Sequence, residues 1–366
     1  MDEKYVVETY KHLHSIPEKA LIEKETGKYI AAALKSFGYE VKENFAGTAV
    51  KGELGSGVPG PVLAVRADMD ALEFFIDGRE QMIHACGHDA NSSMVLAAAK
   101  KLSEQGFEKG RLIFIFQPAE ETGEGAIMVS KSGLLDEVEE MVGIHLRPIA
   151  EARVGEATPA LCHGASRMMA FKITGRASHG ARLHLGVNAI DAAALAVNAV
   201  NAVRVDPRVS HSAKVTGIYS EGTAFNIIPE VVHLKLDLRA QTNEVMDTLA
   251  EGVENAVKAS VQSNGAVAEM TMNHGLPASD YDGALIEIAR ESIEEILGSS
   301  MEPIVTPGGE DFHYYHEMLG IKTAYIGIGA DLTPGLHRPE MAFDLKALEN
   351  GEEILVRFIE KRLGKK

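Results

Sequence analysis

Cysteine is scarce in this chain of 366 residues, which contains Cys86 and Cys162 and no others. Two cysteines cannot build the disulfide framework of a small secreted domain, so a reducing, cytoplasmic location is expected. The first five residues, MDEKY, have no basic flank and lead into no long apolar stretch, which argues against a secretory signal. No apolar run reaches the length of a membrane span, so no membrane association is expected.

Positive charge is also in deficit. The chain has 36 lysines and arginines against 53 aspartates and glutamates, a formal net charge of -17. Nucleic acid and anionic membrane surfaces are therefore disfavoured as partners. Tryptophan is absent, which excludes no function. The length is large for one simple core and predicts two domains.

Apolar runs typical of buried strands alternate with helical patterns in the first and last parts of the chain. Strands are predicted over 62–65, 112–116, 141–144 and 323–328, and helices over 6–14, 26–37, 92–102, 284–297 and 345–363. This alternation is typical of an α/β fold whose mostly parallel sheet carries helices on both faces.

The middle of the chain has a different order of elements. Strands are predicted over 168–174, 214–219, 231–239 and 267–272, with helices over 187–203 and 244–261. The resulting order β-α-β-β-α-β is that of the ferredoxin-like split unit. We therefore predict an inserted α+β domain over 166–274, between a first part of the larger domain at 1–165 and a second part at 275–366.

Polar residues follow each apolar strand of the larger domain. In open α/β sheets, ligands bind outside the carboxyl ends of the strands, so these side chains are expected to converge. They are Asp68 and Asp70 after the first strand, Glu120 and Glu121 after the second, His145 after the third and His337 after the fourth.

Glu120 and Glu121 are the most informative pair. Two adjacent carboxylates repel each other unless a cation or a shared proton holds them. One of them could bind a metal while the other transfers protons. An alternative is that both only open a helix near Thr122, where the helix dipole favours acidic residues. By themselves the two glutamates leave these explanations equal.

The segment HACGHD, which runs from His84 to Asp89, contains a Cys-x-His pair, Cys86 and His88. Thiolate and imidazole are good ligands for borderline transition metals. Alone, the segment favours a structural explanation in which Asp89 caps a helix that starts near Ser92. Asp68 and Asp70 could likewise cap a turn, and lone histidines are more often structural than ligating.

The combination changes this balance. Cys86, His88, one of the glutamates, His145 and His337 offer five ligands from four strand-end loops, which is more than one tetrahedral metal needs. Such a set suits two ions about 3.5–4 Å apart that share a water or hydroxide. The remaining carboxylate would then be the general base.

Ten motifs in order carry a resemblance to a known family. The chain resembles the dinuclear metal-dependent amidohydrolases of peptidase clan MH, which include aminoacylases, hippurate hydrolases, auxin-conjugate hydrolases and N-acetyl-diaminopimelate deacetylases. The motifs are HSIPE from residue 14, ET from 25, RADMDAL from 66, HACGHD from 84, FQPAEE from 116, GIH from 143, GRASHGA from 175, NIIP from 226, GEDF from 309 and HRP from 337.

The resemblance implies roles for these residues. Glu120 would be the general base, and Asp68, with Asp89, would orient the ligands. The implied reaction is hydrolysis of the amide bond of a small N-acyl amino acid, or a related peptide, by a metal-bridging hydroxide. The implied ligands of two divalent ions (Mn, Zn, Co or Ni) are Cys86, His88, Glu121, His145 and His337.

The resemblance also implies a role for the inserted domain, as a lid that forms a homodimer. His179 would polarise the substrate carbonyl, commonly in the partner subunit, and Asn226 would contact substrate. Gly309 could let the backbone approach a ligand. Each has a plainer explanation as a turn residue. The Ala/Val-rich helix at 187–203 fits a dimer contact and burial against its own sheet equally well.

The chain departs from the family at two places. The segment between Leu72 and His84 is shorter than usual, and Glu73 stands where proline is customary. Both changes alter the rim of the expected pocket. A dipeptidase or carboxypeptidase is one alternative function, although the Cys-x-His pair resembles the acylases. A non-catalytic metal- or amino-acid-binding relative is another, against which the intact Glu120 argues.

Overall fold

The computed structural model describes residues 4–222, 224–306 and 308–366. The chain forms two compact units. The smaller consists of His163–Ser279 and Thr306–Gly309, and the larger of Met1–Cys162, Asp280–Val305 and Glu310–Lys366. The predicted insert was 166–274, but its first strand begins at Ala165 and its last ends at Leu276. The smaller unit also contains Gly309, which the predicted division places in the second part of the larger domain.

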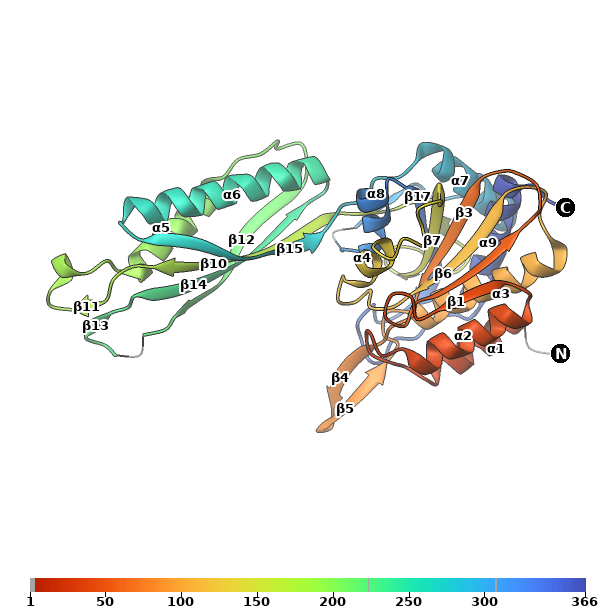
Figure 1. Ribbon diagram of the computed structural model, residues 1–366, viewed down its shortest axis with the longest axis horizontal. Helices are drawn as coiled ribbons and strands as arrows, with labels where there is room; N and C mark the ends of the chain where they lie inside the picture. The colour runs from red at the N-terminus through yellow and green to blue at the C-terminus, as the bar shows by residue number, and fades with distance from the viewer. Residues whose placement is uncertain (1–3, 223, 307) are drawn as a thin grey trace. The chain divides into compact units, whose positions relative to one another are not determined.

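The larger unit is built on a seven-stranded sheet in the order β1-β2-β6-β3-β7-β17-β8 (Figure 1). The four central strands, β6, β3, β7 and β17, are parallel, and the strands beside them pair antiparallel. The predicted α/β class with a mostly parallel sheet and flanking helices is confirmed. The strands are β1 (Glu40–Glu43), β2 (Val50–Gly55), β3 (Val62–Asp68), β6 (Arg111–Gln117), β7 (Glu140–Pro148), β8 (Ala157–Thr158) and β17 (Lys322–Leu332).

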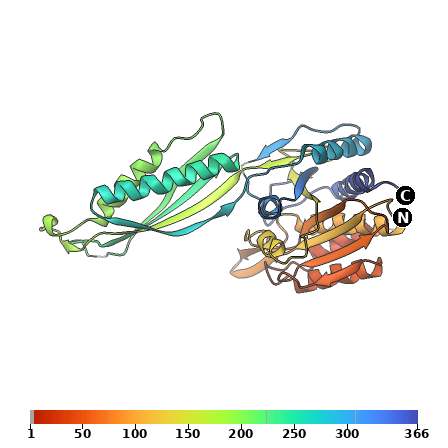
Figure 2. The same ribbon diagram turned by 45° about the horizontal axis from the view of Figure 1, so that its top comes forward.

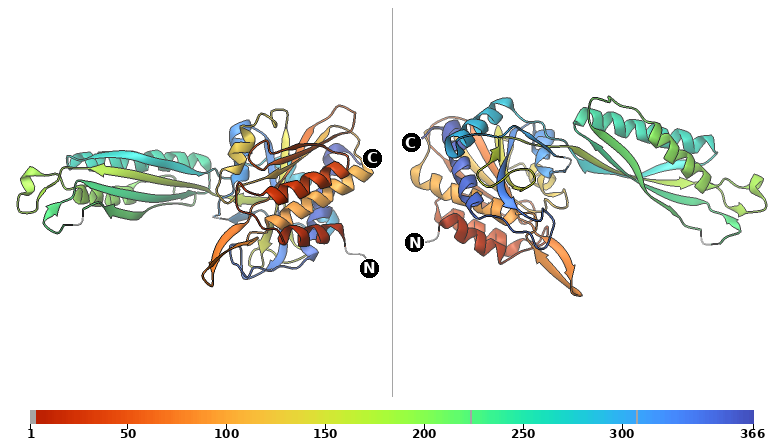
Figure 3. Two further views of the ribbon diagram at one scale, coloured as in Figure 1. Left: turned by 60° about the horizontal axis from the view of Figure 1, so that its bottom comes forward. Right: turned by 180° about the vertical axis from the view of Figure 1, so that it is seen from behind.

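Helices cover both faces of this sheet. Strand β6 is uniformly apolar from Leu112 to Phe116 because its residues are buried on both faces. Leu112, Phe114 and Phe116 point into one core, and Ile113 and Ile115 into another. Figure 3 shows α1, α2 and α3, in red to orange, side by side over one face. The first core includes residues of α1 (Tyr5–His14), α2 (Lys24–Ser36), α3 (His88–Gln105), α7 (Gly283–Leu297) and α9 (Lys346–Leu363), and the second those of α4 (Gly125–Ser130) and α8 (Tyr314–Leu319).

A β-hairpin that the sequence analysis missed occupies the segment that departs from the family. It consists of β4 (Leu72–Ile76) and β5 (Arg79–Ile83). Asp77 and Gly78 form its turn with φ of 51° and 76°, the positive values that tight two-residue hairpins require. The Asp-Gly pair was the available signal. The hairpin leaves Phe75 exposed.

The smaller unit has a four-stranded antiparallel sheet in the order β12-β14-β10-β15, with α5 and α6 on one face (Figures 1 and 2). Val232, Leu234 and Leu236 of β14 point toward these helices. Its elements are β10 (Ala165–Thr174), β11 (Ser178–His179), α5 (Ala189–Ala202), β12 (His211–Ser220), β13 (Ile227–Ile228), β14 (Val231–Ala240), α6 (Asn243–Ser263) and β15 (Val267–Leu276).

Buried and exposed positions alternate along α5. Burial within its own unit explains much of the alanine and valine content of this helix. Ala192, Ala193 and Ala196 are fully buried, whereas Ile190 and Leu195 remain exposed. In the part of the chain that the structure describes, no helix has both the length and the apolar character that crossing a membrane requires.

Candidate metal centre

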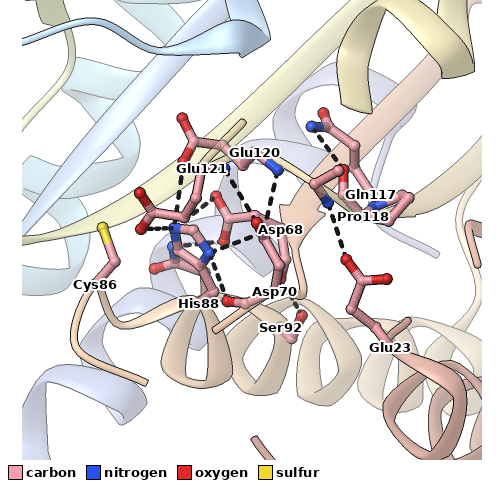
Figure 4. Close-up of polar contacts among 12 residues, drawn as sticks. Glu23, Asp68, Asp70, Cys86, His88, Ser92, Gln117, Pro118, Glu120 and Glu121 are labelled. Atoms are coloured by element: carbon pink, nitrogen blue, oxygen red, sulfur yellow. Dashed lines mark hydrogen bonds and ion pairs between the residues drawn. The ribbon is translucent and has the colours of Figure 1, made fainter. Parts of the chain in front are cut away.

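Polar side chains converge where the four central parallel strands end. Asp68 is the last residue of β3, the two glutamates follow β6 closely, and His145 lies in the second half of β7. Figure 4 shows Cys86, His88, Glu120 and Glu121 directed toward one another. Their donor atoms fall into groups that share members, all within 4.8 Å inside each group: Cys86 with His88 and His145, Cys86 with Glu121 and His337, and His88 with Glu120 and Glu121.

The individual distances are those of side chains facing a common centre. Cys86 Sγ lies 3.6 Å from His145 Nε2. His337 Nε2 lies 3.5 Å from Glu121 Oε1. His88 Nε2 lies 3.7 Å from Glu120 Oε2 and 3.9 Å from Glu121 Oε1. Cys86, His88 and Glu121 each belong to two of these groups, so the groups adjoin one another.

Two buried atoms indicate that these residues fit a metal. His88 Nε2 and Glu121 Oε1 have no hydrogen-bond partner among the described residues. Buried polar atoms almost always have one. Both atoms belong to the donor groups, where a cation would satisfy them. Thiolate, imidazole and carboxylate together suit Mn, Zn, Co or Ni better than Mg or Ca.

The Nδ1 atoms of His88 and His145 are held by the protein. His88 Nδ1 lies 2.9 Å from the Asp70 carbonyl oxygen and 3.2 Å from Asp70 Oδ1. His145 Nδ1 lies 2.7 Å from the Leu146 carbonyl oxygen. Such contacts set the tautomer of a metal-binding histidine and leave Nε2 for the ion.

Asp70 thus makes the orienting contact that the sequence analysis expected from Asp68. The Asp68 carboxylate accepts hydrogen bonds from Arg66 Nη1 at 2.6 Å and Asn91 Nδ2 at 2.8 Å. Asp68 Oδ2 lies 3.9 Å from His88 Nε2. Asp68 therefore borders the donor groups, but its nearest partners are Arg66 and Asn91.

Helix α3 begins at His88, four residues earlier than predicted. Gly87 has φ of 90°, a left-handed conformation that glycine adopts without penalty, and it turns the chain from Cys86 directly into the helix. Asp89 is therefore in the first turn and is not the helix cap. Its carboxylate lies 2.6 Å from Nδ1 of His14, which is not one of the expected metal ligands. Ser92, where the predicted helix began, is buried and donates to the Asp68 carbonyl oxygen.

The backbone of the glutamate pair is anchored by Asp70. Asp70 Oδ1 accepts from the Glu120 N–H at 3.1 Å, and Oδ2 accepts from the Glu121 N–H at 3.0 Å (Figure 4). Helix α4 begins only at Gly125. The pair thus precedes the helix, and the side chains lie among the donor groups. This arrangement favours a site over a simple helix start.

Burial and neighbouring charges shift the protonation of the site. Burial raises the pKa of Glu120 well above its usual range, and the charges of Glu310 and Asp311 raise it further. Burial raises the pKa of the Cys86 thiol well above normal and lowers the pKa of His145 to about 4. A carboxyl group whose pKa is raised above its usual range suits proton transfer.

The positively charged side chain of Arg66 is buried next to the site, and the sequence analysis assigned it no role. Its guanidinium donates to Asp68, to Glu310 at 3.1 Å and to Asp311 at 2.8 Å. These contacts join carboxylates near Glu120 that would otherwise be buried charges without a counter-ion. The partners at 310 and 311 are far away in sequence, so no local pattern could have indicated them.

The three other predicted residues lie in the smaller unit. His179 pairs with Ile227 in the short β11–β13 ribbon, and the Asn226 carbonyl oxygen accepts from the Gly180 N–H at 2.7 Å. His179 and Asn226 are therefore neighbours, and both are exposed. A Cβ atom on Gly309 would come within 2.7 Å of Leu276 Cδ1, at the end of a flexible side chain.

Residues 64–361 match the family described as peptidase family M20/M25/M40. Hippurate hydrolase of Campylobacter jejuni is 30% identical over 92% of this chain and 91% of its own length. N-acetyl-L-cysteine deacetylase of Bacillus subtilis is 29% identical over 94% of this chain and 85% of its own. The crystal structure of a dinuclear metal-binding M20 peptidase of Bacillus subtilis is similar, with a TM-score of 0.83 and 26% identity over 99% of this chain and 98% of that one.

Proposed function

This chain belongs to peptidase family M20/M25/M40, and on that premise we propose that it hydrolyses the amide bond of a small N-acyl amino acid. The predicted resemblance and the predicted enzyme class, a metal-dependent amidohydrolase, are confirmed by the family match and the named relatives. The observation that carries the proposed reaction is the carboxylate of Glu120, which lies beside two groups of metal donors that do not include it, Cys86 with His88 and His145 and Cys86 with Glu121 and His337.

In the proposed site, five residues hold two divalent ions of Mn, Zn, Co or Ni. When bound, such ions lower the pKa of a water molecule and polarise the amide carbonyl. The two unpartnered buried atoms, His88 Nε2 and Glu121 Oε1, support this assignment. The proposed ligands are Cys86, His88, Glu121, His145 and His337.

Glu120 is the proposed general base. Its carboxylate accepts a proton from the attacking water as the carbon–oxygen bond forms. It then returns that proton to the amide nitrogen as the carbon–nitrogen bond breaks, which releases a carboxylic acid and an amine. The buried position of Glu120 and its raised pKa support this role, because a raised pKa makes the carboxylate a better proton acceptor.

The smaller unit is the proposed lid and dimerisation domain. We assign substrate contacts to His179 and Asn226, which lie together and exposed, and a homodimer in which His179 serves the partner's site. The exposed Ile190 and Leu195 of α5 are compatible with such a contact. A cytoplasmic location is proposed because a chain with two cysteines cannot build a disulfide framework.

A substrate screen tests the proposed function. We expect metal-free enzyme to be inactive and Mn²⁺ to restore hydrolysis of N-acetyl and N-benzoyl amino acids. Dipeptides should be hydrolysed with a kcat/KM on the order of tenfold lower. Preference for dipeptides would favour the peptidase alternative. Metal binding without hydrolysis of either class would favour the non-catalytic one.

His179→Ala should lower kcat by about 10²–10³-fold, the usual cost of losing one donor to a developing oxyanion. Its metal content should stay at the wild-type value, since His179 lies outside the donor groups. Steady-state kinetics and metal analysis measure the two quantities. His184→Ala, at another exposed histidine of the same unit, is the matched control and should change neither. Unchanged kinetics for His179→Ala would argue against lid participation.

Uptake of Co²⁺ by the metal-free protein should tighten by more than about tenfold for each unit of pH between about pH 6 and 8. Burial raises the pKa of the Cys86 thiol, and the pKa of His88 is also raised, because the charges of Asp68 and Cys86 outweigh the opposing effect of its burial. Both groups are protonated in this range and must lose a proton to bind metal. Higher pH removes that competition. The pKa of His145 is lowered to about 4, so this residue releases no proton. Titrations at several pH values measure the slope, and a flat profile would contradict the thiolate ligand.

A further inference from the structure

Three successive backbone N–H groups in the loop after β6 each donate to a buried carboxylate. Asp70 accepts from Glu120 and Glu121, as described above. The remaining group, the Ala119 N–H, donates to Glu23 Oε1 at 3.0 Å. Figure 4 shows Glu23 approaching this loop from the side opposite Cys86. Two carboxylates from distant parts of the chain therefore hold consecutive peptide groups.

The Glu23 carboxylate is itself fixed. Glu23 is fully buried and lies directly before α2. Its Oε1 also accepts from the Leu21 N–H at 3.0 Å, and its Oε2 accepts from the Thr48 hydroxyl. With both oxygens engaged, the carboxylate has little freedom to move. Glu23 thus connects the segments around Leu21 and Thr48 to the loop that carries Glu120.

Ala119 is the residue that needs this support. Its φ of 57° lies in the left-handed region, which a residue with a Cβ rarely adopts. Such conformations persist at functional sites only when surrounding contacts enforce them. The peptide on the amino side of Ala119 is held by Glu23. On the other side, the Ala119 carbonyl oxygen accepts from the Gly125 N–H at 3.1 Å.

We infer that Glu23 is a positioning residue for the Glu120–Glu121 pair. Its bond to the Ala119 N–H maintains the left-handed turn, which leaves the two glutamate side chains 3.7 and 3.9 Å from His88 Nε2. This inference rests on the proposed function for the roles of the two glutamates. Glu23 touches neither metal donors nor reacting atoms in this arrangement and acts through Ala119.

Two substitutions of Glu23 by side chains of similar length distinguish the loss of the hydrogen-bond acceptor from a loss of side-chain volume. Glu23→Met removes the acceptor, and Glu23→Gln retains it at the same position. We expect Glu23→Met to bind Co²⁺ about 10–100-fold more weakly, as is typical when a residue that supports a ligand is lost, and Glu23→Gln to stay within about threefold of wild type. In turnover, Glu23→Met should lower kcat and leave KM nearly unchanged. Competition titration with a chelator measures the affinity.

Glu140 provides a matched control. It is a buried carboxylate that accepts from Arg362 at the amino end of β7, whereas the donors lie toward the carboxyl ends of the strands. Glu140→Met should lower the unfolding midpoint and leave Co²⁺ affinity at the wild-type value. If Glu23→Met does not fold, Glu23→Asn replaces it, because an amide one methylene shorter falls short of the Ala119 N–H.

Two results would overturn the inference: wild-type Co²⁺ affinity in Glu23→Met, or a Glu23→Gln variant as weak as Glu23→Met. The first would make Glu23 a purely structural anchor for α2. The second would assign its effect to charge rather than to a hydrogen-bond acceptor. Since the readout is metal affinity, it is independent of turnover. A wild-type chain that binds Co²⁺ but hydrolyses no amide would refute the proposed function and leave the positioning role testable.

Discussion

Glu120→Gln is expected to lower kcat by about three orders of magnitude, within the range that general acid–base catalysis contributes, with unchanged metal content. Glutamine keeps the size of the side chain but cannot take a proton from water. The donor groups of Cys86 with His88 and His145, and of Cys86 with Glu121 and His337, remain complete without Glu120. Turnover and metal stoichiometry should therefore separate in this variant.

Glu124→Gln is the matched control for that result. Glu124 lies in the same loop, four residues further along, and is exposed. Its turnover should stay within about twofold of wild type, as expected for a surface substitution away from the site. If Glu120→Gln retained more than a tenth of wild-type kcat, Glu120 would not be the base. If it lost metal instead, Glu120 would be a ligand, and its role would be that assigned to Glu121.

The convergence of the site was predictable because it follows from the strands. Runs such as Leu112–Phe116 are apolar at every position, which marks them as buried on both faces. Each is followed by a polar residue that can only lie at the carboxyl end of a parallel strand. Neighbouring parallel strands bring those ends together. The sequence alone therefore predicted that Asp68, Glu121 and His145 would lie near one another.

The supports of the site could not be predicted in the same way. Arg66 meets Asp311 across 245 residues, and Glu23 meets Ala119 across 96, so neither pair leaves a local pattern. The start of α3 at His88 depends on the left-handed Gly87, and Asn91, which precedes the predicted start, donates to the distant Asp68. Sequence patterns indicate which face of an element is buried. The contacts of Arg66 and Glu23 depend instead on which distant residue packs against that face.

Cys86→Ala should have the broadest effect on the metal centre. Cys86 is the member shared by the groups with His88 and His145 and with Glu121 and His337. Its loss removes a donor from both, so we expect saturating metal to fall from the proposed two ions per chain to fewer than one, with turnover reduced by at least about 10³-fold. His145→Ala and His337→Ala each weaken one group and should retain about one ion. Metal analysis after gel filtration measures the stoichiometry.

Cys162→Ala is the control, because Cys162 is the other cysteine of the chain and lies outside the donor groups among the described residues. It should retain both ions and wild-type turnover. The three site variants also distinguish a shared ligand from a terminal one. If Cys86→Ala retained one ion, as the two histidine variants should, the thiolate would serve a single ion and another residue would have to connect the pair. Glu121 would then be the nearest candidate, since its Oε1 lies within 4 Å of both His88 Nε2 and His337 Nε2.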